Sequence, residues 1–138
     1  MSKLLNFVYC LSVERENEKV SASNILSILT PEFIPGSFSF AIVFSISDVN
    51  PTEKNTIKVI FKNSEEDITL VDSGEIIIPA PETKDGTNLL DEKIGLDLSM
   101  DLRNVVFEKE GFYTTQIFFN GELIGEREIR VKGNRNGN

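Results

Sequence analysis

Alternation of apolar and polar residues is clearest from Phe38 to Ile46. Large apolar side chains occupy every second position, namely Phe38, Phe40, Ile42, Phe44 and Ile46. Successive side chains of a β-strand point to opposite faces, so this set lies on one face and needs an opposing layer. The segment Ile57 to Lys62 repeats the pattern. We expect these two strands to pair as neighbours.

Further β-rich runs surround this pair. They are Leu4 to Val13, Val20 to Leu29, Asp67 to Val71 and Gly74 to Pro79. The first two are joined by the charged turn Glu14 to Lys19. The break at Asp72 to Gly74 is either a hairpin turn or a bulge within one longer strand. The polar segment Ala80 to Glu92 is predicted to be a long loop.

The segment from Ile94 to Leu102 also alternates, although a near-helical spacing is present as well. We favour a strand because Gly95 and Ser99 are poor residues for a helix interior. After Leu102 the apolar positions change parity. A bulge near Arg103 and Asn104 would keep both halves of the strand facing the core.

Two β-rich runs, 111 to 119 and 122 to 131, flank an Asn120-Gly121 pair that favours a tight hairpin turn. A regular two-residue turn would pair Tyr113 with Glu128 and place Ile129 on the opposite face from Tyr113. One extra residue at Ile124-Gly125 corrects the parity, and a three-residue loop over 120 to 122 would do the same. We predict that Tyr113 and Ile129 share a face.

These runs number eight or nine, and no helix is expected. The sequence therefore predicts an all-β fold, an antiparallel β-sandwich of immunoglobulin-like or related Greek-key topology. We expect a single domain over residues 1–132 and a disordered tail over 133–138. Strand order is left open.

The tripeptide Gly111-Phe112-Tyr113 resembles the corner before the F strand of an immunoglobulin-like sandwich. In that corner the tyrosine hydroxyl bonds to an upstream backbone group, whereas the alternative is a surface tyrosine after a glycine turn. Thr115 stands where the second sandwich cysteine would be, and the chain has no tryptophan. An antibody-type domain is therefore excluded.

A wider resemblance covers nearly the whole chain. Its segments are Leu5 to Cys10, Phe33 to Phe38, Leu102 to Phe107 and Gly111 to Val131. They look like those of a family of short bacterial proteins of unknown function. The resemblance implies a single all-β domain and implies no activity.

Net charge and cysteine content limit the classes of binding partner and the cellular compartments that we expect. The chain has 22 acidic and 14 basic residues and a net charge of −8, which disfavours nucleic acid and anionic membranes as partners. The one cysteine, Cys10, excludes an intramolecular disulfide and agrees with a reducing compartment. We interpret Cys10 as a small buried hydrophobe and the protein as cytoplasmic.

Candidate chemistry is sparse. The absence of histidine removes the usual general base and the commonest metal ligand, and no phosphate-binding glycine motif occurs. Asp97 and Asp101 share a strand face but lie about 13 Å apart, too far for a retaining glycosidase pair. Calcium is the ion best suited to the acidic loops, which are 48–50, 65–67 and 85–92. None of them has EF-hand spacing, and we predict no cofactor.

The sequence favours a non-enzymatic interaction or accessory module with a protein partner. Alternating charges at Glu126 to Arg130, together with Arg103 and Asn104, are consistent with a partner surface or with protection of an edge strand. A small-ligand, carbohydrate or calcium-binding sandwich is the alternative, and carboxylate-dependent hydrolysis is the third. No catalytic, cofactor-binding or metal-binding residue is assigned.

Overall fold

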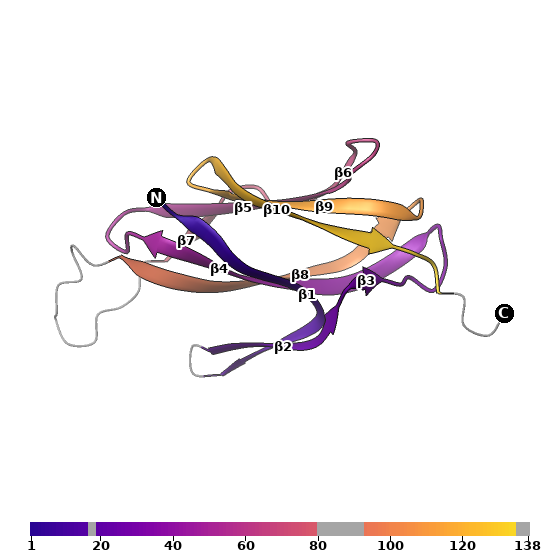
Figure 1. The fold of residues 1–138 in the computed structure, drawn as a ribbon, viewed down its shortest axis with the longest axis horizontal. Helices are drawn as coiled ribbons and strands as arrows, with labels where there is room; N and C mark the ends of the chain where they lie inside the picture. Colours follow the sequence, from indigo (N-terminus) through magenta and orange to yellow (C-terminus); the bar gives the residue numbers. More distant parts are fainter. Residues whose placement is uncertain (17–18, 80–92, 135–138) are drawn as a thin grey trace.

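The computed structural model describes residues 1–16, 19–79 and 93–134. Two β-sheets face each other in these residues (Figure 1). The first sheet has the order β2-β1-β4-β8, formed by β1 (Lys3–Glu16), β2 (Lys19–Leu26), β4 (Gly36–Val49) and β8 (Ile94–Phe107). The second has the order β3-β10-β9-β5-β6, formed by β3 (Ile28–Leu29), β10 (Glu122–Val131), β9 (Gly111–Phe119), β5 (Asn55–Asn63) and β6 (Thr69–Asp72). The short strand β7 (Ile76–Ile78) also pairs with β5.

The strand order confirms the predicted immunoglobulin-like sandwich. The run β1-β4-β8 corresponds to strands A, B and E of such a sandwich, and β10-β9-β5 corresponds to G, F and C. All pairs among the described strands are antiparallel except β3 with β10, which is parallel. The second sheet is therefore mixed, which the expectation of a purely antiparallel sandwich missed.

The predicted strand Val20 to Leu29 is divided between the two sheets. Leu26 pairs with Tyr9 in the first sheet, whereas Leu29 pairs with Val131 in the second. Because the backbone crosses from one sheet to the other between Leu26 and Ile28, both halves of this segment pack against the core. This division makes ten strands in the described residues, where eight or nine were predicted.

The predicted pairing of the Phe38 and Ile57 strands is wrong. These strands are β4 and β5, which belong to opposite sheets. The rings of Phe40 and Phe61 lie 5.3 Å apart between the sheets. Alternation identifies which face of a strand is apolar, and that face contacts the opposing layer whichever strands pair edge to edge.

Other local predictions are confirmed. Strand β6 pairs antiparallel with residues 60–62 of β5, and β7 pairs antiparallel with residues 55–57 of the same strand. Both therefore lie along one edge of β5, and the break at 72–74 interrupts this edge strand and does not form a hairpin. Residues 94–107 form one strand, and its register against β4 shifts next to Asn104, whose φ is 54°. The predicted loop Ala80 to Glu92 lies outside the described residues.

Gly133 and Asn134, the first two residues of the predicted tail, are bonded to the sandwich. The Gly133 N–H donates to Glu110 Oε2 at 2.8 Å, and the Asn134 N–H donates to the Pro31 carbonyl at 2.8 Å. Both residues are thus tied to the sandwich by their backbone. Residues 135–138 lie outside the described part of the chain.

The β9–β10 hairpin has the predicted bulge. Phe119 pairs with Glu122 across a two-residue turn, with φ of 51° at Asn120 and 85° at Gly121, so a three-residue loop is excluded. The register then shifts between Leu123 and Gly125. As a result Tyr113 pairs with Ile129, and both are buried.

Gly125 is also where the two sheets approach each other. A Cβ at this position would lie 3.1 Å from Leu4 Cβ and closer still to a methyl of the same side chain. Strands β1 and β10, side by side in Figure 1, contact each other here. Glycine therefore serves both the bulge and the contact with β1.

Aromatic side chains form the centre of the core. Phe61, Phe107 and Tyr113 are mutually packed, with ring centroids 5.0 to 5.9 Å apart. The Tyr113 hydroxyl donates to the Lys109 carbonyl oxygen at 2.8 Å. This bond confirms the predicted tyrosine corner, because the hydroxyl returns to an upstream backbone group.

Tyr9 connects the sheets at a second point. Its hydroxyl donates to the Arg127 carbonyl oxygen at 3.1 Å and shares a 2.7 Å hydrogen bond with Thr115 Oγ1. The side chain is buried, and burial raises the Tyr9 pKa to about 12, with the Thr115 hydrogen bond opposing the shift. Burial disfavours the charged phenolate, so the folded protein holds the proton more tightly.

We predict that Gly125→Ala destabilises the fold by about 1 to 3 kcal/mol, because the new methyl group overlaps Leu4. Urea unfolding gives this difference, with Gly95→Ala in β8 as the control, because a Cβ there meets only the Ile46 carbonyl oxygen at 3.8 Å. A second variant, Gly125→Ala with Leu4→Ala, should recover part of the loss. Equal stability of wild type and Gly125→Ala would contradict the contact.

We predict that stability falls as pH rises from about 10 to about 12. The unfolded chain releases the Tyr9 proton near 10.0, the ordinary pKa of tyrosine, before the folded chain does, so the loss reaches about 2 to 3 kcal/mol. Tyr9→Phe should be less stable at pH 7 by about 1 to 2 kcal/mol and should lack this part of the alkaline loss. Urea unfolding between pH 7 and 11.5 compares the two, and parallel pH profiles would refute the assignment.

Candidate functional site

The second sheet turns one broad surface away from the core. We call it the outer face, and it carries the outward side chains of the three central strands β5, β9 and β10. They are Lys58, Ile60, Lys62, Phe112, Thr114, Gln116, Phe118, Leu123, Glu126, Glu128 and Arg130. Alternation places them opposite the core residues of the same strands.

Cross-strand pairing arranges the outer face in rows. Lys62, Thr114 and Glu128 form one row. The other two central rows are Ile60, Gln116 and Glu126, and then Lys58, Phe118 and Leu123. In these three rows basic residues lie along β5, acidic residues along β10, and uncharged residues along β9 between them, whereas Arg130 lies on β10 beside Phe112 in the next row.

Apolar groups accompany the charges. Leu123 is 45% exposed and Phe112 is 42% exposed, while Ile60 and Phe118 are half-buried. The Lys58 ammonium lies 4.7 Å from the centre of the Phe118 ring, and the Arg130 guanidinium lies 5.9 Å from that of Phe112. These cations lie over aromatic rings, which gives the face a mixed apolar and charged character.

Two of the face's charges already have neighbours. Lys62 Nζ lies 2.6 Å from Asp67 Oδ1, with the lysine side chain only 23% exposed. Gln116 Nε2 lies 3.5 Å from Glu126 Oε1, a long and weak contact. The carboxylates of Glu126 and Glu128 are on exposed residues and are open to another molecule.

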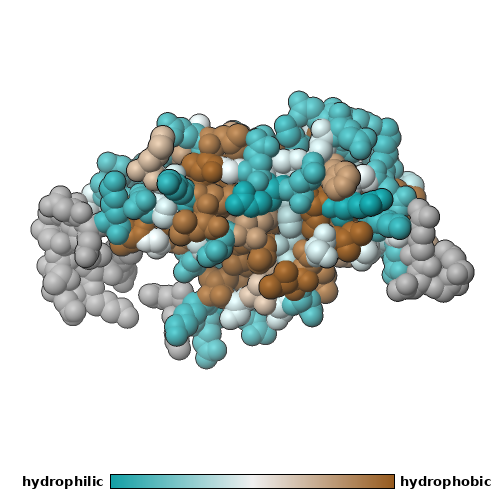
Figure 2. All heavy atoms as spheres, viewed as in Figure 1, coloured by the Kyte–Doolittle hydropathy of each residue, from teal (hydrophilic) through white to brown (hydrophobic). Residues whose placement is uncertain are grey.

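A space-filling view shows the contrast between the layers and the surface (Figure 2). Hydrophobic residues are densest between the two layers, and hydrophilic residues cover much of the rest of this side.

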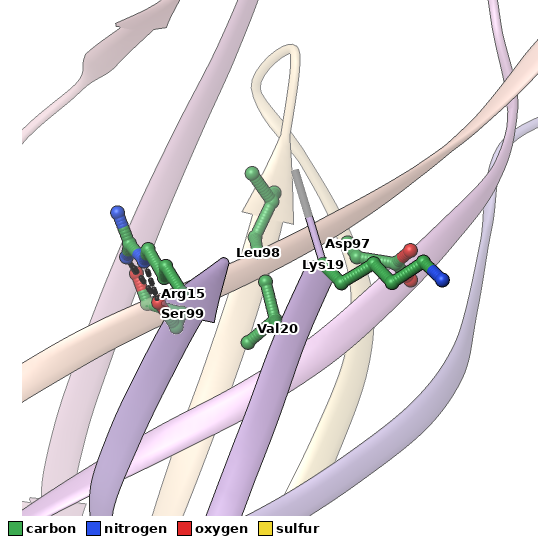
Figure 3. Close-up of a pocket in the computed structure, with 6 residues that line it drawn as sticks. All are labelled: Arg15, Lys19, Val20, Asp97, Leu98 and Ser99. Carbon is green, nitrogen blue, oxygen red and sulfur yellow. Dashed lines mark hydrogen bonds between the residues drawn. The ribbon is translucent and has the colours of Figure 1, made fainter. Parts of the chain in front are cut away.

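A second candidate is a cleft of about 310 Å³ beneath the β1–β2 hairpin. Arg15, Lys19 and Val20 line it from the hairpin, and Asp97, Leu98 and Ser99 line it from β8 (Figure 3). Arg15 Nε donates to Ser99 Oγ at 3.0 Å, and Arg15 Nη2 donates to the Ser99 carbonyl at 3.2 Å. These bonds attach the hairpin to β8, so the guanidinium has a structural role.

The same hairpin lies on the side of the first sheet that faces away from the second sheet (Figure 1). Cys10 and its cross-strand partner Ala41 are fully buried. Burial raises the Cys10 pKa, and the nearby charge of Asp101 adds to the shift. The interpretation of Cys10 as a buried hydrophobe is confirmed, because a thiol with a raised pKa is a poor nucleophile near neutrality.

Asp97 and Asp101 are not brought together into a catalytic pair. Asp97 Oδ1 accepts a hydrogen bond from Ser45 Oγ at 2.6 Å, while Asp101 lies 3.8 Å from the guanidinium of Arg103. Both lie on the polar side of β8. The two carboxylates therefore have separate partners.

The acidic loops have internal roles where they are described. Asn50 Oδ1 accepts from the Thr52 N–H and hydroxyl at 3.0 and 2.7 Å. Glu66 pairs with Lys109, and Asp67 pairs with Lys62. Outside the gaps at 17–18, 80–92 and 135–138, no group of three or more His, Cys, Asp and Glu residues is placed to hold a metal ion. Calcium binding at 85–92 stays a prediction, since that segment lies in a gap.

The sequence indicated only part of the outer face. The alternating charges from Glu126 to Arg130 are visible in the sequence, but nothing in the sequence connects them with Lys58, Lys62 and the residues of β9. Their relation depends on strand order, since β5 pairs with β9 across more than fifty residues of chain. The available signal was the Lys58-Ile60-Lys62 alternation opposite an apolar face.

The fold and the sequence now define the class. The molecule is an immunoglobulin-like β-sandwich with a mixed-charge outer face. The sequence model of the family of unknown function DUF6941 matches residues 5–132. The chain therefore belongs to that family, in agreement with the resemblance found in the sequence.

Solved structures resemble this fold at low identity. The alkylpurine DNA glycosylase AlkC of Pseudomonas fluorescens, bound to DNA containing an abasic site analog, matches with a TM-score of 0.55 at 8% identity. The match covers 95% of this chain and 30% of that one, so this chain spans under a third of the glycosylase. An immunoglobulin-like protein from Pseudomonas aeruginosa matches with a TM-score of 0.48 at 9% identity, over 96% of this chain and 97% of that one.

The likeness to the glycosylase shows the fold alone. A β-glucosidase from Listeria innocua also matches, with a TM-score of 0.47 at 11% identity, over 96% of this chain and 16% of that one. No curated protein matches the sequence. No helix in residues 1–16, 19–79 or 93–134 has the length and hydropathy needed to cross a membrane.

We predict that Arg15→Ala loosens the β1–β2 hairpin without unfolding the sandwich. Loss of the bonds to Ser99 should speed amide hydrogen exchange over β2 several-fold, with a change in unfolding free energy below about 1 kcal/mol. Arg103→Ala, which removes an exposed arginine from β8, is the control. Unchanged exchange in β2 would contradict the anchoring role of Arg15.

Proposed function

We propose that the chain is a non-enzymatic interaction module that binds a protein partner through the outer face. The observation that carries this proposal is the local composition of the face. It presents three basic and two acidic side chains with aromatic and aliphatic groups between them, in a chain of net charge −8. Aromatic residues and arginine are enriched at protein interfaces, and charge complementarity selects the partner.

The exposed edge of β10 is less suited to this role. Its bulge at Leu123 to Gly125 interrupts the register, and Glu126 and Arg127 follow directly. Bulges and charged residues are features that prevent strand addition at a sheet edge. The partner is therefore expected to contact side chains of the face rather than extend the sheet.

We propose a cytoplasmic, bacterial setting, which rests on the single cysteine and on the resemblance noted in the sequence. Nucleic acid is not proposed as the partner. The DNA in the glycosylase structure belongs to that protein, and a net charge of −8 disfavours contact with phosphates.

A small ligand is the second candidate, and the hairpin cleft favours it. At about 310 Å³ the cleft is near the lower limit for a small-molecule site, and Lys19 and Asp97 line it beside the contact between Arg15 and Ser99. Such a ligand, added at millimolar concentration, would raise the melting temperature of the protein. Thermal-shift measurements with sugars, carboxylates and calcium test this candidate.

We predict that removing the apolar groups of the outer face weakens binding of the protein partner at least tenfold. The test variant is Phe112→Ser with Leu123→Ser, and the control is Leu11→Ser with Ile25→Ser, which removes exposed apolar groups from β1 and β2. Tagged wild type and both variants are used for quantitative affinity capture from source cells. Partner recovery should fall for the test variant only.

Equal recovery by the test variant and the wild type would reject the outer face as the binding surface. Loss of partner recovery with the control variant alone would indicate that the β1–β2 hairpin is the binding surface. Melting temperatures of all three proteins show whether each is folded.

A further inference from the structure

We infer that the partner of the outer face is a second copy of this chain, bound face to face about a two-fold axis that runs along β9. This inference rests on the proposed function and names the partner for the same surface. Its basis is that the charged side chains of this face are arranged so that two copies of the face are complementary in charge.

Four of the five charges of the face are divided by sign across the central strand, and Arg130, at the end of β10, is the fifth. Lys58 and Lys62 project from β5 on one side of β9, and Glu126 and Glu128 project from β10 on the other. A two-fold rotation about an axis along β9 places β5 of each copy over β10 of the other. Lys62 of one copy then faces Glu128 of the other, and the same contact occurs twice because the interface is isologous.

The residues that lie on the two-fold axis can contact the same residues of the second copy. In such a dimer Thr114, Gln116 and Phe118 of β9 each face the same residue of the other copy. None of them carries a charge, and side-chain amides both donate and accept hydrogen bonds. The row that contains Phe118 also brings Leu123 over the hydrocarbon part of Lys58 of the other copy, which buries apolar surface.

The other in-plane two-fold axis is disfavoured. An axis perpendicular to the strands would place β5 over β5 and β10 over β10. Lysines would then face lysines and glutamates would face glutamates, which costs free energy when such charges are brought together. Charge complementarity thus selects one of the two face-to-face arrangements.

The charge that selects a copy of this chain is that of the outer face, because two whole chains of net charge −8 repel each other. A strongly basic partner would be attracted to the whole chain and would not need this face. The outer face is instead nearly balanced, with both signs separated by one strand. A surface that offers the same separation in reverse is the outer face of a second copy.

The test uses two charge reversals and their mixture. In Lys62→Glu alone, and in Glu128→Lys alone, every contact between these two positions in the homodimer joins like charges. When the two variants are mixed, both contacts of the heterodimer again join opposite charges. Sedimentation equilibrium of the full chain between about 1 and 500 µM measures self-association and mixed association.

We expect wild type to dimerise in this range, each single variant to dimerise at least tenfold more weakly, and the mixture to regain wild-type affinity. Lys54→Glu and Glu53→Lys make the same charge changes in the exposed turn between β4 and β5, and they should leave dimerisation unchanged. If Lys62→Glu, which also faces Asp67, fails to fold, the reversals Lys58→Glu and Glu126→Lys supply a second pair, whose side chains lie on neighbouring rows across the interface and whose effect should be smaller.

A monomeric wild type at 500 µM would overturn the inference, and so would a mixture no tighter than the single variants. Either result leaves the proposed function standing if partner capture still depends on Phe112 and Leu123. If capture does not depend on those residues, the proposed function fails, whatever the state of association.

Discussion

The register of β10 against β9 is the constraint on which both faces of the second sheet depend. The single-residue shift at Leu123 to Gly125 sends Ile129 and Val131 into the core. Without it, Glu126 and Glu128 would point at the aromatic cluster, because a shift of one residue exchanges the two faces of a strand. The bulge therefore creates the core and the acidic side of the outer face together.

The same position links the sheets. Gly125 accommodates Leu4 of β1, so the irregularity of β10 coincides with its contact to the first sheet. Tyr9 makes the second link, from β1 to the Arg127 carbonyl two residues further along β10. A displacement of β10 would thus remove a packing contact and a buried hydrogen bond at once. Gly125 and Tyr9 therefore together fix the position of β10 relative to the first sheet.

Sequence reasoning predicted the strands well and their partners poorly. Alternation identified the inward faces of β4 and β8, and parity alone located the bulges near Asn104 and Gly125. It did not show that β4 and β5 lie in opposite sheets, because periodicity contains no information on which edges meet. The division of 20–29 between sheets was missed for the same reason, since a continuous apolar run does not reveal where the backbone changes layer.

The outer face was harder to predict than the fold. Lys62 and Glu128 are far apart in the chain and become members of one row only through Thr114 between them. Each residue alone is an ordinary exposed charge of a strand, for which protection of the edge is a sufficient explanation. The separation of signs across a neutral strand is a property of three strands together, and it requires their order to be known.

The most direct measurement of the central claim is the concentration dependence of amide resonances in nitrogen-15 NMR spectra of the wild-type chain. Face-to-face association predicts shifts or broadening between about 10 and 500 µM that are confined to β5, β9 and β10 and centred on Gln116. Resonances of β2 and of the outward residues of β8, such as Asp101, should stay constant. Spectra that do not change with concentration, or changes centred on the β1–β2 hairpin, would contradict the account.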